Sequence, residues 1–171
     1  MTPFGQGLED SALSQAIKDA GWAIPLLQSI HIVTIGVVFV SSLMISLRVF
    51  GTLRADEPFP AVWKRFAPWM WSGLVVMVIT GVFLVIGEPI REFTALSFWL
   101  KMTLLLIAVI ATAVFGRTFA PAARAEPAAV FSPGAKAFAG SILAVWIAII
   151  FLGRAIAYDV EVWGALSLHS T

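Results

Sequence analysis

One histidine lies within an apolar stretch of this chain, and it is the first residue whose chemistry stands out. His31 belongs to the run of residues 22–50, which contains no Asp, Glu, Lys or Arg before Arg48. A titratable side chain at membrane depth is costly, and it usually faces the protein interior, a cavity or a ligand. An imidazole in such surroundings can ligate haem iron or hydrogen-bond a quinone carbonyl. We therefore take His31 as the centre of a candidate binding site.

Each apolar run of the chain places polar side chains toward the same membrane surface as His31. On the first two runs these side chains lie at about the depth of His31, counted from the run ends at the helical rise. Two cations on the third and fourth runs lie nearer the surface. The candidate cofactor-binding residues are Gln28, His31, Thr34, Met77, Thr80, Lys101 and Arg154.

A haem of the b type is one cofactor that these residues would suit. His31 would be the axial ligand of the iron, and Lys101 and Arg154 would neutralise the propionates. The second axial ligand would be Met77 or the His31 of a second protomer. Alternatively, the haem would be five-coordinate, with His31 as its one protein ligand. A quinone or another lipid needs less, namely a donor such as His31 or Thr80 and a slot between helices.

The same residues also have purely structural interpretations. His31 can hydrogen-bond a neighbouring helix, with Gln28 or Thr34 completing the network. Lys101 and Arg154 lie one turn from the ends of their runs, where cations commonly extend toward lipid headgroups. Both interpretations stay open on the sequence alone.

The elements that must position these residues are membrane-spanning helices. The chain has 171 residues, of which 60% are hydrophobic and 12% charged, and its mean hydropathy is +0.94. We expect a single all-α domain over residues 1–171, an integral membrane four-helix bundle with spans at about 22–50, 68–87, 98–116 and 137–158. Residues 6–20 alternate apolar and charged positions with helical periodicity, which predicts an N-terminal amphipathic helix on the membrane surface.

Composition also excludes several kinds of site. The chain has no cysteine, so it forms no disulfide, thiolate metal site or iron–sulfur cluster, and redox work would need a bound cofactor. The net charge of +1, without a basic cluster, gives no sign of nucleic-acid binding. No nucleophile–base pair or glycine-rich phosphate loop indicates a hydrolase or transferase.

The distribution of cations predicts the orientation in a bacterial inner membrane. One side carries seven Lys or Arg residues, Arg48, Arg54, Lys64, Arg65, Arg117, Arg124 and Lys136. The other side carries four, Lys18, Arg91, Lys101 and Arg154. The richer side is expected to be cytoplasmic, which makes both termini periplasmic and places His31 in the outer leaflet.

Four segments carry a resemblance to a known family. The stretches LQSIHIVTIGVVFVSSLMISLRVFG, PWMWSGLVVMVITGVFLVIGEP, FWLKMTLLLIAVI and WIAIIFLGRAIAY resemble a family of small bacterial membrane proteins of unknown function. Thr80-Gly81, followed by Phe98, Lys101 and an aliphatic run, is more remotely similar to CopD-type copper-resistance membrane domains and their cytochrome b relatives. That likeness implies a four-helix bundle and metal or haem handling. The chain departs from the di-haem pattern, because only His31 is available within the spans.

Three classes of function remain to be distinguished. A cofactor-binding electron-transfer protein would use the His31 site. A non-catalytic accessory or structural subunit would belong to a homodimer or a larger membrane complex. A channel or transporter would need a polar path through both leaflets, and the aliphatic character of the inner half argues against it. There, Ser42, Ser46, Ala108 and Thr112 have spacings suited to close helix packing.

Overall fold

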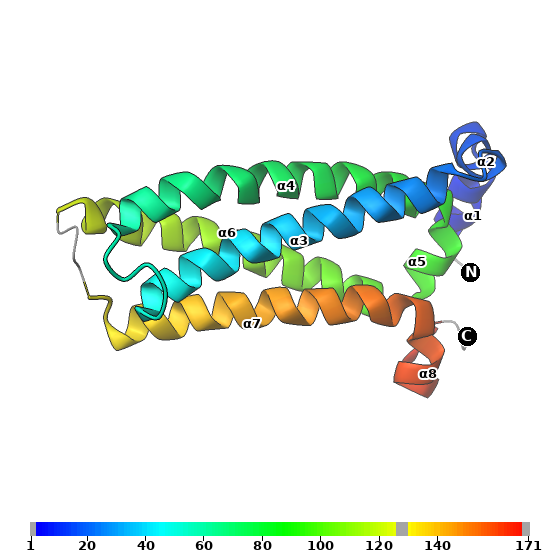
Figure 1. Ribbon diagram of the computed structural model, residues 1–171. Coiled ribbons are helices and arrows are strands. Elements are labelled where there is room, and N and C mark those ends of the chain that lie inside the picture. Colours follow the sequence, from blue (N-terminus) through cyan, green and yellow to red (C-terminus); the bar gives the residue numbers. More distant parts are fainter. Residues whose placement is uncertain (1–2, 126–129, 169–171) are drawn as a thin grey trace.

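The computed structural model describes residues 3–125 and 130–168, and the regular secondary structure in that part of the chain is all helical (Figure 1). Four helices in it are long and apolar enough to cross a membrane, which confirms the predicted multi-pass four-helix bundle. The long helices are α3 (Ala23–Phe50), α4 (Phe59–Gly87), α6 (Leu96–Ala125) and α7 (Pro133–Ala155). The short ones are α1 (Pro3–Glu9), α2 (Ala12–Asp19), α5 (Pro89–Thr94), α8 (Asp159–Trp163) and the 3₁₀ turns η1 (Ile156–Tyr158) and η2 (Gly164–Leu166).

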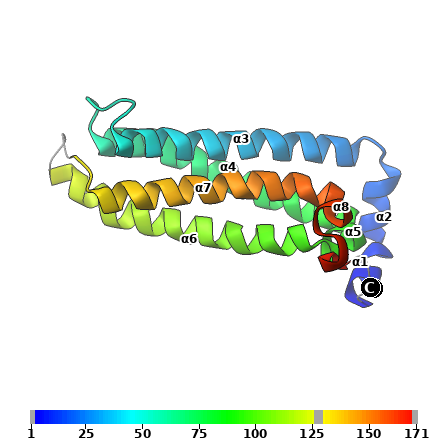
Figure 2. The same ribbon diagram turned by 90° about the horizontal axis from the view of Figure 1, so that it is seen from below.

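The long helices form a ring in which each packs against two neighbours. α3 lies between α4 and α7, and α6 lies between the same two helices, so that α3 and α6 occupy one diagonal. Figures 1 and 2 show the four helices running side by side along one axis. We call the end that carries α1, α2, α5 and α8 the cap end, and the end where residues 51–58 join α3 to α4 the loop end. Both termini are drawn at the cap end (Figure 1).

Several helix boundaries differ from the sequence-based prediction. α6 runs from Leu96 to Ala125, where a span over residues 98–116 was predicted, and α7 begins at Pro133 rather than at residue 137. α4 begins at Phe59 rather than at Pro68, because Pro58 and Pro60 flank its first turn and the helix continues through Pro68. The amphipathic helix predicted over residues 6–20 is two helices. Ser11 separates them, since its hydroxyl donates to Leu8 O at 2.7 Å and accepts from Ser14 N–H at 3.2 Å, which caps α2.

Glycines on α4 let neighbouring helices approach closely. A Cβ at Gly73 would lie 3.0 Å from Val38 Cγ2 of α3, and one at Gly87 would lie 3.2 Å from Ile17 Cγ2 of α2. Small residues at such contacts are the usual means of close packing inside a membrane. Ile17 is therefore buried against the bundle. α2 packs on the cap end through this side chain, and its opposite face is polar.

At the cap end, one buried carboxylate ties the C-terminal segment to the start of α6. Asp159 accepts hydrogen bonds from the amides of Leu96 at 3.1 Å and Ser97 at 2.9 Å, and from the hydroxyls of Ser97 at 2.7 Å and Ser167 at 2.6 Å. The Trp163 indole donates to Ser97 Oγ at 2.8 Å. The carboxylate thus satisfies amides at the N-terminus of α6, which have no partner within their own helix.

At the loop end, a buried arginine fixes the connection between α3 and α4. Arg48 is 4% exposed, and its Nε donates to Glu57 O at 2.6 Å. The Glu57 carboxylate pairs with Arg54 at 2.6 Å and with Arg65 at 3.4 Å. Gly51 ends α3 in the left-handed region with φ of 78°, which favours glycine. The loop therefore has a defined conformation without large apolar contacts.

The closest glycine contact gives a direct test of this packing. A Cβ at Gly116 of α6 would lie 2.3 Å from Trp63 Cζ2, so Gly116→Ala must displace the indole ring. We expect the variant to lose about 1–3 kcal/mol of stability through overpacking. Thermal unfolding in mild detergent, followed by tryptophan fluorescence, would measure the loss.

Gly36→Ala is the matched control for this variant. A Cβ at Gly36 would meet no atom within 4 Å, so the substitution should leave stability unchanged or slightly raised. Equal unfolding temperatures for the two variants would contradict the packing of Trp63 on Gly116.

Candidate functional site

The candidate site lies between α3 and α4 in the half of the bundle nearer the cap end. His31 Nδ1 is 2.8 Å from Thr80 Oγ1. Gly81 follows Thr80, and a Cβ there would lie 3.4 Å from His31 Cε1. The imidazole therefore rests on the small surface of Gly81 while the preceding hydroxyl holds one of its nitrogens.

The partners of Thr80 indicate which histidine nitrogen carries the proton. The Thr80 hydroxyl has one hydrogen, and the carbonyl oxygens of Val76 at 2.9 Å and Met77 at 3.1 Å accept it on the same helix. A Thr80 hydroxyl that donates to either carbonyl accepts from His31 Nδ1–H. In this tautomer Nε2 carries no hydrogen and keeps its lone pair, as a nitrogen that binds a metal or accepts a proton must.

Lys101 brings a positive charge to the same half of the bundle. It lies on α6, and its Nζ is 4.0 Å from the position of a Cβ at Gly153 on α7, so the glycine leaves room for the side chain. Lys101 interacts electrostatically with His31 and with the buried Glu92 of α5. Among the described residues no carboxylate lies within 4 Å of its ammonium group.

Met77 enters the site mainly through its backbone. Its carbonyl oxygen is near both Thr80 and His31, whereas its side chain is 5% exposed and belongs to the main apolar core. Its predicted role as an axial ligand stays a prediction.

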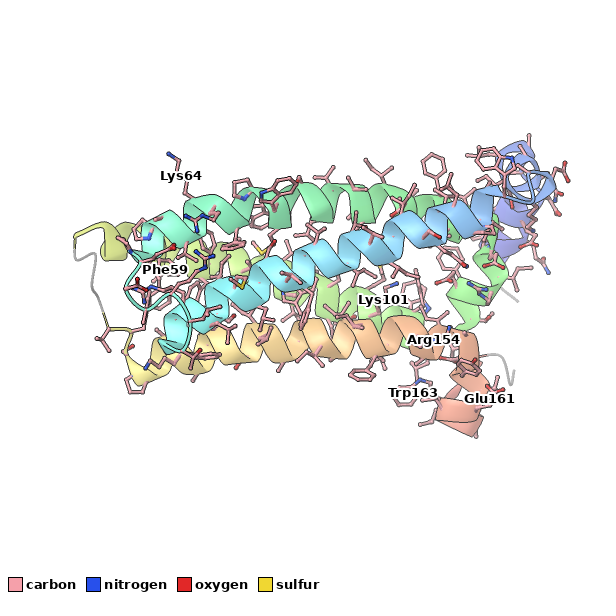
Figure 3. The ribbon with its side chains drawn as sticks, in the orientation of Figure 1. Phe59, Lys64, Lys101, Arg154, Glu161 and Trp163 are labelled. Atoms are coloured by element: carbon pink, nitrogen blue, oxygen red, sulfur yellow. The ribbon has the colours of Figure 1, made fainter. Side chains whose placement is uncertain are left out.

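The remaining predicted residues have other neighbours. Thr34 donates to the Ile30 or His31 carbonyl of its own helix, both at 2.9 Å, and Gln28 is exposed. The Arg154 guanidinium lies 5.2 Å from the centre of the Tyr158 ring, near the cap end (Figure 3). His169, a remote candidate for an axial position, lies outside the described residues. The structure thus brings together His31, Thr80 and the Met77 carbonyl, with Lys101 nearby.

Two participants were not predicted from the sequence. Glu92 was not among the candidate residues, yet it is 7% exposed and interacts with Lys101. Gly81 was noted only as part of a dipeptide, although it supports the imidazole ring. In residues 3–125 and 130–168 no three His, Asp or Glu side chains converge as a metal site would require.

The hydrogen bond to Thr80 can be tested directly. We expect NMR spectra of isotope-labelled histidine to show the Nδ1–H tautomer for His31 in the wild-type protein. Thr80→Val removes the acceptor while keeping the side-chain shape, so the tautomer population should shift toward Nε2–H. Thr103→Val is the control, because the Thr103 hydroxyl donates to Trp99 O on the exposed side of α6. An unchanged His31 signal in Thr80→Val would refute the assignment.

Comparison with known proteins gives a family for the chain. No curated protein matches the sequence and no solved structure matches it, so neither comparison supports the remote likeness to CopD-type domains. The profile of a family of unknown function, DUF6644, matches residues 9–159, a range that includes α3, α4, α6 and α7 in full. The chain therefore belongs to the family of unknown function DUF6644.

Proposed function

We propose that this membrane protein binds a redox cofactor at His31 and takes part in electron transfer. The observation that carries the proposal is the hydrogen bond between His31 Nδ1 and Thr80 Oγ1, which orients the ring and leaves the Nε2 lone pair free. A hydrogen bond to the second ring nitrogen is the usual support of a histidine that binds a metal.

Haem b is the first candidate cofactor. It would take Nε2 of His31 as an axial ligand, and the Lys101 ammonium would attract a propionate. Lys101 is suited to this role because it lies in the same half of the bundle and has no carboxylate within 4 Å in the described part of the chain. A second His31 from a partner protomer, or Met77, would complete a six-coordinate iron.

A quinone is the second candidate, and the partial exposure of His31 favours it. His31 belongs to a helix whose neighbouring residues Ile32 and Val33 are 67% and 66% exposed, so a lipid-soluble molecule can approach the site from the bilayer. One quinol hydroxyl would donate to His31 Nε2, and the Lys101 ammonium would donate to the oxygen of the other hydroxyl. His31 would then be placed to accept a proton when the quinol is oxidised.

A visible spectrum tests the haem proposal. Protein purified in mild detergent should show reduced α and Soret bands after dithionite, and His31→Ala should lose them. Gln28→Ala is the control, because Gln28 is exposed on the same helix and should leave the bands unchanged. A featureless spectrum from folded wild-type protein would exclude haem.

The quinone candidate is then tested on the same samples. Organic extracts of the wild-type protein should contain quinone, and extracts of His31→Ala should contain far less. If neither cofactor is found, a role as accessory subunit of a larger membrane complex becomes the better proposal.

We also propose that the loop end faces the cytoplasm of a bacterium and that both termini are periplasmic. The loop end carries Arg48, Arg54, Lys64 and Arg65, and cytoplasmic ends are rich in such residues. A C-terminal alkaline phosphatase fusion should be active, whereas a C-terminal green fluorescent protein fusion should be dark. The reverse pattern would overturn the orientation and place His31 in the inner leaflet.

A further inference from the structure

A small cavity lies within the bundle, in the half nearer the loop end and away from His31. Its volume is about 20 Å³, and all four spanning helices contribute to its wall. Ser42 and Ser46 of α3 and Thr112 of α6 supply hydroxyl groups, while α4 and α7 contribute apolar side chains such as Met70 and Ile142. The cavity thus combines a mostly apolar wall with three side chains that can form hydrogen bonds.

Thr112 is the member of this wall whose hydroxyl has no partner. It is 5% exposed, and its Oγ1 forms no hydrogen bond with any described residue. Several other hydroxyls on the spanning helices donate to the carbonyl oxygen four residues earlier, as Ser41 does at 2.7 Å, Thr80 at 2.9 Å and Thr103 at 3.0 Å. Leaving a buried hydroxyl without a partner costs about 1–3 kcal/mol of stability. An acceptor in the cavity would remove this cost for Thr112.

A second unpartnered donor lies in the same core cluster. The indole of Trp146 on α7 is 3% exposed, and its N–H has no acceptor within the described part of the chain. Trp146 is one helical turn from Ile142, which lines the cavity. Thr112 and Trp146 thus lie on the neighbouring helices α6 and α7, and two buried donors without partners are unusual in a packed bundle.

We propose that this cavity is a water-binding site, in which one water molecule accepts from Thr112 and hydrogen-bonds Ser42 and Ser46. A cavity holds one water when about 10–15 Å³ is open to the water, and the water needs two to four polar partners. The described residues that line it are all neutral, which favours water over an ion. The water would join α6 to α3 across the bundle diagonal, where the two helices are not packed neighbours.

The first test is a crystal structure at a resolution that shows ordered water. We expect one peak within about 3 Å of Thr112 Oγ1 and of a Ser42 or Ser46 hydroxyl, and its absence from Thr112→Val. Empty density in the wild-type cavity, or xenon bound there under pressure without displacing a water, would overturn the proposal, because a dry apolar cavity takes up xenon.

The second test is the sign of a change in unfolding temperature. If water is bound, Thr112→Val removes one of its partners and should lower Tm by about 2–4 °C. If the cavity is dry, the same variant removes an unsatisfied hydroxyl and should raise Tm. Thr103→Val, whose hydroxyl bonds its own helix on the exposed side of α6, is the control and should change Tm little.

A double variant tells whether α3 and α6 share the water. Ser42 and Thr112 do not hydrogen-bond each other, so independent effects should add. With a shared water, Ser42→Ala and Thr112→Val together should lower Tm by clearly less than the sum of the single variants. Simple additivity would contradict the bridge.

Discussion

Polar groups within the bilayer must find their partners inside the protein, and this constraint accounts for much of the structure. Lipid offers no hydrogen bonds, so backbone groups are satisfied within the helices and side-chain hydroxyls turn back to carbonyls of their own turn. Ser41, Thr80 and Thr103 all follow that pattern. Small residues such as Gly73 then bring α3 and α4 into close contact.

The same constraint explains why the strongly polar contacts lie at the two ends. Arg48 reaches the Glu57 carbonyl at the loop end, and Asp159 collects the amides of Leu96 and Ser97 at the cap end. Each contact joins residues that are close to the limits of the spanning helices, where water and headgroups begin. The ends therefore define how the helices connect, while the small residues between them define how closely the helices pack.

Much of this arrangement follows from the sequence, and the exceptions have identifiable causes. Length and hydropathy predict four spans, because each run is long enough to cross the bilayer and has few charges. The start of α4 was missed because Pro68 is read as a first-turn residue, yet a neighbouring core tolerates a proline inside the helix. A hydrogen bond from His31 to a neighbouring helix was one of the interpretations left open, but the choice of Thr80 as partner and the role of Gly81 depend on the rotation of α4, which periodicity does not fix. Asp159 bonds residues 62 and 63 positions away, so no local pattern reveals it.

The two polar centres of the bundle are separated by an apolar layer. On α3, the buried Val38 lies between His31 and Ser42, and on α4 the buried Leu74 lies between Met70 and Thr80. A conducting path for ions or protons would need polar groups or water along the whole bundle. Apolar side chains such as Val38 and Leu74 interrupt such a path. The separation argues against a conducting path along the bundle. It also means that the cavity at Thr112 contributes to the packing of the loop-end half independently of the His31 site.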